Sequence, residues 1–527
     1  MSRLQKYYPF FASALLMWIV LWLIYPHYQY YIDPDGTAYL TISKRYAGGD
    51  IQRAINGYWS PWACWLTAGL IKLGLQAIPA SVIINALGAT GFLYISQSFF
   101  MRFGIVRKMQ WMLNITLAFF LCYAIFWQSF DDLWECFFLL GALRLMLIEE
   151  FKNRPALWVI MGVIGALAYF AKAYSFPFFI LNTICCAWFI AKGNKIQWLK
   201  ISFVAVGIMV LCGLPWIVAL HHKYGIWTTS TSGTLNMSWY LVGHPHWKPG
   251  IDLLIPPAYP DSPYYWEDPW FANGDTPHFW DSLSLLKDEI IRAGYHVVLF
   301  VIATLQLSVF FPLITIVAVL SLFLKKIKPI FTEDLKVAVT SFLLFPLGYV
   351  LVNFESRYLW YMVPLSMLFG AVLLQNGYFK FRIPAKVLAV IFPVSFLIVP
   401  ALELTPMYYY NGQNEYQFAT QLKAANIQGS FTGNMYPRYM SRIAYFSGSR
   451  YYFLLANSRF NGTGLMNEIK RDKIEYYIHF TAVNSFTWID LAEYFNDYQF
   501  LTENSDKLTE VKIEGINNNV RVFRVSQ

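Results

Sequence analysis

Charged residues are scarce in this sequence, and their scarcity excludes an ordinary soluble domain. Only 13% of the 527 residues are Asp, Glu, Lys or Arg, whereas 57% are hydrophobic and 19% are aromatic. A typical soluble domain has about a quarter of its residues charged. The composition therefore predicts an integral membrane protein.

Cysteine is also rare, and its placement argues against a disulfide framework or a zinc site. All six cysteines lie in apolar segments, where we expect them to act as small packing residues. The sequence has no Walker A or GxGxxG motif, which argues against nucleotide binding. The cysteines are Cys64, Cys122, Cys136, Cys185, Cys186 and Cys212.

Long apolar runs are abundant, and about eleven of them are candidate membrane spans, since a spanning helix needs about 20 apolar residues. The first run follows MSRLQK without a small-residue cleavage site, which favours a retained span over a signal peptide. A further apolar stretch, 61–78, contains Lys72 and is flanked by prolines, which favours an interfacial helix. The predicted spans are residues 9–26, 80–100, 111–128, 133–149, 156–171, 175–191, 199–220, 296–324, 337–352, 359–376 and 386–403.

Basic residues occur in every loop on one side of this predicted topology. With the N-terminus inside and 61–78 not crossing, each inner loop is basic, which is the positive-inside pattern. The net charge of +9 is thus explained by topology and not by a nucleic-acid surface. The inner-loop residues are Arg3 and Lys6; Arg102, Arg107 and Lys108; Lys152 and Arg154; Lys192, Lys195 and Lys200; Lys325, Lys326 and Lys328; and Lys380, Arg382 and Lys386.

Two polar loops fall on the outer side in this topology. Residues 27–79 form a first outer loop with juxtamembrane helices, and residues 221–295 form a large outer loop rich in proline, tryptophan and acids. A loop of such length in a compact protein is usually functional. His244 and His246 in the large loop resemble a metal-binding pair, although a plain surface loop is the favoured interpretation.

The tail changes character after the last apolar run. Residues 404–527 are mixed polar, with a helix-like stretch at 413–424 and strand-like stretches at 476–480 and 520–523. We therefore predict a small soluble α/β domain on the outer face. Residues 1–403 form the predicted transmembrane catalytic domain.

Two carboxylates open the first outer loop. Asp33 and Asp35 flank Pro34 and precede Gly36, which predicts a stiff, non-helical bend before a short helix over Thr37–Tyr46. One interpretation is a solvated turn with a helix cap. The other is a functional acid, because a carboxylate held among aromatics beside a bilayer can act as a general base.

Further ionisable groups fall on the same outer face. Asp131 and Asp132 lie between two predicted spans, Lys172 ends another, and Glu355, Arg357 and Tyr358 form a further cluster. Ionisable groups at membrane depth are costly and often functional. The alternative is that each anchors a helix end at the interface.

Several of these positions resemble the GT-C glycosyltransferases, in particular the lipid A aminoarabinose transferase and protein O-mannosyltransferase branch. The likeness covers about residues 9–375, by the topology above. The matching motifs are Asp35-Gly36-Thr37-Ala38-Tyr39, Gly49-Asp50, the Pro61–Leu66 segment, Gly165 to Lys172, Leu214-Pro215-Trp216 and Arg357-Tyr358.

The resemblance implies roles for these residues. Asp35 falls on the catalytic acid of the family, with Asp33 beside it, and Arg357, Lys172 and Tyr358 fall near the donor phosphate. Two departures from the pattern of the family leave metal use open. Where the family often has a Glu, this chain has Gly36, and where the family often has a Lys, this chain has Trp59-Ser60. If a divalent metal binds, Asp33 and Asp35 are its ligands. Other site candidates are Asp131, Asp132, Glu355, Tyr39 and Tyr58.

The expected function is transfer of a sugar from a polyprenyl-phosphate donor to an envelope lipid, glycan or protein. We expect a multi-pass inner-membrane enzyme with a cytoplasmic N-terminus and an extracytoplasmic tail, in contact with membrane lipids and without nucleic-acid partners. Three alternatives stay open: an oligosaccharide ligase or polymerase with a polyprenyl-diphosphate donor, a lipid or sugar transporter, and a scaffold for an envelope partner. Only the enzyme hypotheses require Asp35.

Overall fold

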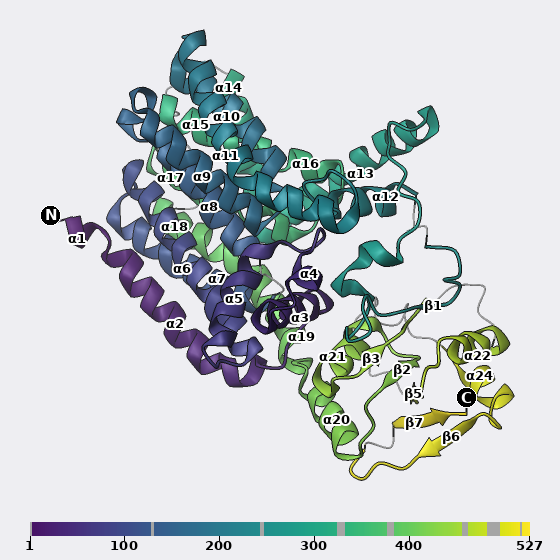
Figure 1. Ribbon diagram of the computed structural model, residues 1–527. Helices are drawn as coiled ribbons and strands as arrows, with labels where there is room; N and C mark the ends of the chain where they lie inside the picture. Colours follow the sequence, from purple (N-terminus) through teal and green to yellow (C-terminus); the bar gives the residue numbers. More distant parts are fainter. Residues whose placement is uncertain are drawn as a thin grey trace. The chain divides into compact units, whose positions relative to one another are not determined.

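The computed structural model divides into two structural units, and each unit is assembled from three separate stretches of the chain. The first unit comprises residues 1–26, 50–244 and 277–405, and the second comprises 27–49, 245–276 and 406–527. The second unit thus combines purple, teal and green-to-yellow parts of the chain in Figure 1. The structure describes residues 3–127, 131–242, 247–323, 332–376, 384–455, 462–481, 496–516 and 519–526.

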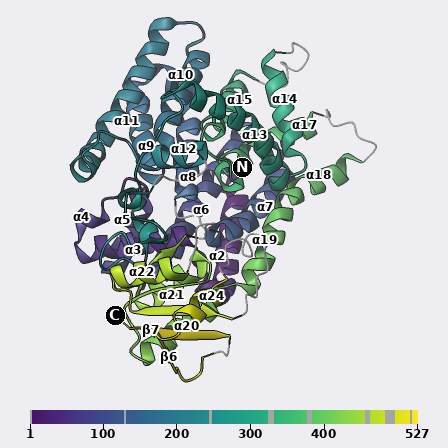
Figure 2. The same cartoon turned by 90° about the vertical axis from the view of Figure 1, so that its right-hand side faces the viewer.

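The regular elements described in the first unit are all helices. Helix α9 packs against α8 and α11, and α10 lies beside α11 in both Figure 1 and Figure 2. The longer helices are α2 (Tyr8–Tyr28), α6 (Ala77–Arg102), α7 (Arg107–Phe126), α8 (Asp132–Met146), α9 (Pro155–Ala171), α10 (Ser175–Ala191), α11 (Lys195–Tyr224), α12 (Ser232–Val242), α13 (Leu283–Leu307), α14 (Phe311–Phe323), α15 (Glu333–Leu344), α17 (Met362–Gln375), α18 (Ala385–Val394) and α19 (Ile398–Tyr409).

Within the described ranges, six helical stretches are long and apolar enough to cross a membrane. They are α2, α6, α7, α11, α13 and the stretch Lys386–Ala424. Four shorter apolar helices, α9, α10, α14 and α17, fall on or within other predicted spans. The predicted polytopic, mostly helical membrane protein is therefore confirmed, whereas the number of about eleven spans stays a prediction.

The predicted span 296–324 is wrong as a single helix. The structure has α13 and α14 here, separated at Ser308, whose backbone is extended with φ −168° and ψ 138°. Pro312, in the first turn of α14, lacks the N–H that a continuous helix would donate to the Ser308 carbonyl.

The predicted outer loop 221–295 contains more helix than expected. Helix α12 lies within it, and α13 begins at Leu283. The start of α13 is fixed by Ser282, whose side chain accepts a hydrogen bond from the Leu285 N–H at 3.1 Å. Such an N-cap satisfies one of the unpaired donors of a helix start.

The predicted first outer loop contains three helices, of which the first and third were predicted and the second was not. They are α3 (Pro34–Gly48), α4 (Ile51–Ala54) and α5 (Pro61–Lys72). Helix α5 has only 12 residues, and α6 starts separately at Ala77, so α5 is too short to span a bilayer. Its interfacial position stays a prediction.

A mixed five-stranded sheet forms the core of the second unit (Figure 1). Strand β2 pairs in parallel with β3 and β5, and β7 pairs antiparallel with β5 and β6. The α/β character expected of the tail is thus confirmed, and β5, β7 and α20 lie on the predicted stretches. In sheet order the strands are β3 (Arg450–Tyr451), β2 (Ser430–Gly433), β5 (Tyr476–Phe480), β7 (Val520–Val525) and β6 (Leu508–Val511).

Helices cover both faces of this sheet. In β5, Tyr476 and Ile478 pack with α20 (Gln413–Ala424) and α21 (Pro437–Ser447), whereas Tyr477 packs with α22 (Gly462–Arg471) and α24 (Tyr498–Glu503). This division follows from the alternation of side chains along a strand. Figure 1 shows the two helix pairs on opposite sides of the strands.

The segment 27–49 joins the second unit through buried polar contacts. Arg442 of α21, 1% exposed, donates to the Ile32 carbonyl and pairs with Glu415 at 2.9 Å. Gly412 has φ +82°, and a Cβ there would collide with the Tyr30 carbonyl oxygen. Only glycine therefore permits this close approach.

The segment 245–276 joins the same unit through backbone pairing. Its strand β1 (Leu254–Ile255) pairs antiparallel with β4 (Phe453–Leu454). The carboxylate of Glu468 on α22 also accepts from the N–H groups of Leu253 and Leu254, at 3.1 and 2.9 Å. The loop that follows β1 is thus fixed to the tail domain.

Candidate functional site

Asp33 and Asp35 lie at the start of α3, so the predicted non-helical bend is wrong. Pro34 begins the helix, because its missing N–H is not needed in the first helical position. Asp33 is the N-cap: its Oδ1 accepts from the Gly36 N–H at 2.9 Å and its Oδ2 from the Asp35 N–H at 3.2 Å. Asp33 is 3% exposed and serves as a buried helix cap.

Asp35 is the more accessible carboxylate of the pair. It is half-buried, and its Oδ1 accepts a hydrogen bond from Trp266 Nε1 at 2.9 Å. It lies in the first turn of α3, where the helix dipole favours a negative charge. The arrangement supplies an oriented carboxylate that can receive a proton from a hydroxyl group.

Arg45, near the end of α3, binds the loop that contains Trp266. Its guanidinium bonds the two Asp261 oxygens at 3.0 and 3.1 Å, contacts Glu267 through Nε, and lies 3.3 Å from Ser262 Oγ. We name Arg45, Asp261, Ser262 and Glu267 the loop clamp. Such forked bonding fixes orientation as well as distance, so the clamp holds η2 (Tyr265–Glu267) against α3.

The loop clamp also shows how a buried charge is tolerated. Burial raises the pKa of Glu267, and its bonds with Arg45 partly reverse this shift. Burial lowers the pKa of Arg45, but its bonds with Glu267 and Asp261 more than offset the burial. Both directions are those expected for an ion pair whose partners depend on each other.

In the first unit, Lys172 directly follows α9 and lies against two acids of α8. Its Nζ contacts Asp132 Oδ1 and is 3.8 Å from Glu135 Oε2. Glu135, 2% exposed, also accepts a hydrogen bond from Ser175 Oγ at 3.0 Å. The lysine side chain itself is 19% exposed, so a ligand can approach it.

Arg357 and Tyr358 belong to η5 (Ser356–Leu359) and complete this arrangement. Arg357 Nε donates to Glu355 at 2.7 Å, and its Nη1 is 4.0 Å from Asp132. The Tyr358 hydroxyl donates to Glu355 at 3.0 Å, and its ring lies 4.4 Å from Lys172 Nζ. We name Lys172 and Arg357, with their partners Asp132, Glu135, Glu355 and Tyr358, the cationic cluster, after its two cations. The structure thus brings together Asp132, Lys172 and the Glu355–Tyr358 group, which the sequence suggested as three separate sites.

Three further predicted residues have different surroundings. Asp131 precedes α8 and is 4% exposed. Tyr39 is buried within α3 of the second unit. Tyr58 belongs to the first unit and donates from its hydroxyl to Asn236 of α12 at 2.9 Å.

The structure gives no three-ligand metal group among the residues it describes. No set of three His, Cys, Asp or Glu side chains in these ranges is placed to hold a metal ion. Both Asp33 oxygens already accept backbone N–H groups. His244 and His246 lie outside the described residues.

Sequence reasoning missed Trp266, Arg45, Glu267 and Glu135. Glu135 had a detectable signal, because a carboxylate inside a predicted span is costly unless it has a partner. Trp266 and Glu267 lie in an aromatic, acidic run of the predicted large outer loop, but Arg45 is 222 residues from Glu267. No local pattern links residues so far apart.

The comparisons with known proteins identify the fold of this chain. No protein-family model and no curated protein sequence matches the chain. The crystal structure of ArnT from Cupriavidus metallidurans bound to undecaprenyl phosphate matches 98% of this chain and 97% of its own, at 10% identity and a TM-score of 0.56. Its apo form matches the same shares at 11% identity and a TM-score of 0.54.

The chain has a GT-C fold. The predicted resemblance to the GT-C glycosyltransferases is therefore confirmed at the level of the fold, whereas the roles of Asp35 and of the Arg357-Tyr358 pair stay predictions. Within a GT-C fold, both the acid at the start of α3 and the cationic cluster become candidates for chemistry.

Proposed function

We propose that this chain is an integral membrane glycosyltransferase that moves a sugar from a polyprenyl-phosphate donor to an envelope acceptor on the outer face. The GT-C fold supports this, as does the undecaprenyl phosphate bound by ArnT, which shares the fold. The observation on which the proposal depends most is the cationic cluster, because it combines an arginine, a lysine and a tyrosine hydroxyl at partly exposed positions.

The chemistry assigned to Asp35 is that of a general base. An acceptor hydroxyl attacks the anomeric carbon of the donor sugar, and Asp35 takes the hydroxyl proton. The bond between the anomeric carbon and the phosphate oxygen breaks, and its electron pair leaves with the polyprenyl phosphate. Trp266 orients the Asp35 carboxylate for this transfer through its N–H group.

The chemistry assigned to the cationic cluster is stabilisation of the leaving phosphate. A lipid phosphate is already a stable anion, so no general acid is needed. Arg357 suits this role because its planar fork matches phosphate oxygens, and Lys172 adds a second positive charge. Asp132, Glu135 and Glu355 hold the two cations in place before the donor binds.

Two measurements test the proposal. In lipid nanodiscs, undecaprenyl phosphate should bind the purified protein and raise its melting temperature, whereas dodecyl phosphate should have little effect. Cells with and without the protein should differ in one glycolipid or glycoprotein class by mass spectrometry. A difference that persists with Asp35→Asn, or no binding of undecaprenyl phosphate, would contradict the assignment.

A further inference from the structure

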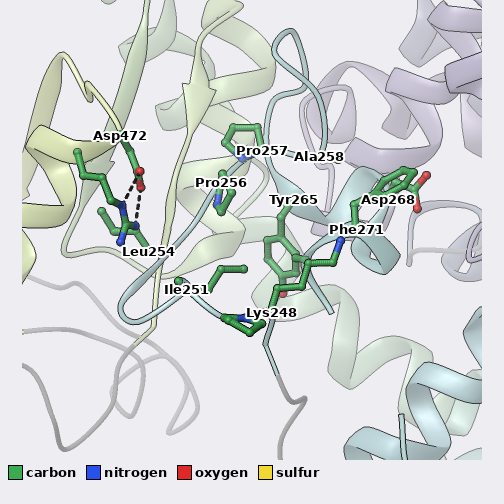
Figure 3. Close-up of a pocket in the computed structure, with 14 residues that line it drawn as sticks. Lys248, Ile251, Leu254, Pro256, Pro257, Ala258, Tyr265, Asp268, Phe271 and Asp472 are labelled. Atoms are coloured by element: carbon green, nitrogen blue, oxygen red, sulfur yellow. Dashed lines mark hydrogen bonds and ion pairs between the residues drawn. The ribbon is translucent and has the colours of Figure 1, made fainter. Parts of the chain in front are cut away.

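A pocket of about 360 Å³ lies wholly within the second unit and is used by neither cluster. Its volume falls at the lower end of the range of about 300–1,000 Å³ found for small-molecule sites. The wall is formed by the segment 248–272 together with Arg471 and Asp472 at the end of α22. Figure 3 shows Tyr265 in the middle, with Asp472 on one side and Phe271 and Asp268 on the other.

The lining combines flat apolar surface with hydrogen-bonding groups. Tyr265 and Phe271 supply aromatic rings, and Ile251, Pro256 and Pro257 supply further apolar contacts. Tyr265 is held by Phe453, whose ring stacks on it at 5.3 Å and 13°, so its position is fixed before a ligand arrives. Rigid aromatic rings suit the apolar faces of pyranose sugars, and polar groups at their edges suit the hydroxyls.

The charges of the lining are balanced. Lys248 and Arg471 are cationic, and Asp268 and Asp472 are anionic. Arg471 is already bonded to Asp472, at 2.9 and 3.0 Å. The guanidinium fork of Arg471 is thus already occupied by a carboxylate, and the mixed donors and acceptors of the lining suit a neutral, hydroxyl-rich ligand.

The pocket shares a loop with the proposed base. Tyr265 and Asp268 line it, while Trp266 between them donates to Asp35 and Glu267 joins the loop clamp. We propose that the pocket is a subsite for a neutral sugar of the acceptor. This inference rests on the proposed function, and it implies that the acceptor is a glycan or a glycolipid and not an unmodified protein.

The test is sugar binding without any donor. Saturation-transfer NMR on the full-length protein in nanodiscs would use disaccharides of glucose, galactose, mannose and N-acetylglucosamine, with glucuronic acid and inorganic phosphate as anionic probes. We expect at least one neutral disaccharide to bind. Phe271→Ala should weaken it at least about fivefold and Lys248→Gln about threefold. Lys512→Gln, an exposed substitution in the same unit, should leave binding unchanged.

Two results would overturn the subsite. One is that no neutral disaccharide binds, or that only the anionic probes do. The other is unchanged sugar affinity in Phe271→Ala with an unchanged melting temperature. Because binding requires no donor, sugar transfer that persists without disaccharide binding would reject the subsite alone. Sugar binding without any transfer would reject the enzyme function alone.

Discussion

The Arg45–Glu267 pair of the loop clamp and the two cations of the cationic cluster differ in how completely their side chains are enclosed. In the clamp, the side chains of Arg45 and Glu267 are 6% and 1% exposed, whereas that of Asp261 is 58% exposed. In the cluster, Lys172, Arg357 and Glu355 are 19%, 13% and 40% exposed, whereas Asp132 and Glu135 are 7% and 2% exposed. The Nη1 of Arg357 also stays 4.0 Å from Asp132 rather than closing a forked pair.

This difference separates two uses of an ion pair. Removing one partner of an enclosed pair leaves a buried charge without compensation, which is costly to the fold. A partly exposed pair costs less to disturb and can exchange a partner for a ligand. The enclosed Arg45–Glu267 pair therefore has the character of a structural contact, whereas the partly exposed Lys172 and Arg357 are candidates for binding a ligand.

The largest expected effect is on catalysis and comes from Asp35→Asn. If Asp35 is the base, sugar transfer falls by roughly 10²–10⁴-fold, because the amide cannot accept the hydroxyl proton. Its half-buried, helix-start position is compatible with the nearly isosteric amide, so the melting temperature should hold. The measurement is transfer by the purified variant, once the donor sugar is known. Near-normal transfer would remove Asp35 from the chemistry.

The next effect is on stability and concerns the enclosed Arg45–Glu267 pair. Glu267→Ala should cost roughly 3–5 kcal/mol, because it leaves Arg45 buried and underpaired. Denaturant unfolding of the protein in detergent, followed by tryptophan fluorescence, measures it.

The matched control for that substitution is Glu510→Ala. Glu510 pairs with Arg521 at 2.6 Å, but both side chains are more than 40% exposed. Its loss should cost at most about 1 kcal/mol. Equal costs for Glu267→Ala and Glu510→Ala would mean that enclosure does not distinguish the clamp.

Arg357→Ala tests whether the cationic cluster binds phosphate. We expect binding of undecaprenyl phosphate to weaken by roughly 10–100-fold, because charge-assisted bonds to phosphate are lost. Arg357→Lys should restore part of the affinity, since lysine keeps the charge but not the fork. Arg154→Ala, an exposed change in the same unit, is the control. Equal affinities of all three variants would exclude Arg357 as a phosphate ligand.

The smallest effect concerns the helix cap. Asp33→Ala should destabilise α3 by about 0.5–2 kcal/mol, whereas Asp33→Asn should be almost neutral, because asparagine caps nearly as well. Thermal melting of both variants measures this. A loss of transfer in Asp33→Asn as severe as in Asp35→Asn would show that Asp33 does more than cap the helix.

Hydropathy and periodicity predicted the elements that depend on local pattern. The apolar runs gave the long helices, and alternation in the tail gave β5 and β7. The same reasoning placed Asp35 on a bend, because Pro34 and Gly36 were read as helix breakers. In the structure, the side chain of Asp33 instead caps the helix, and Pro34 occupies the first helical position.

The site itself depends on contacts that no local pattern encodes. Charge and topology predicted Lys172, Asp132 and Arg357 on one membrane face, but they could not predict the pairing of these residues with one another. Trp266 and Asp35 are 231 residues apart, and only the folded second unit brings them together. Sequence reasoning therefore identified many of the chemical groups without the partners that orient them.

The assembly of the second unit from three stretches of chain has a consequence for biosynthesis. Residues 27–49 leave the ribosome early, yet Glu415 and Arg442, which receive them, are made about 400 residues later. At about 5–20 residues per second, that interval is roughly 20–80 s. The segment that contains α3 therefore cannot make its contact with Arg442 until nearly the whole chain has been synthesised, long after Asp35 itself has left the ribosome.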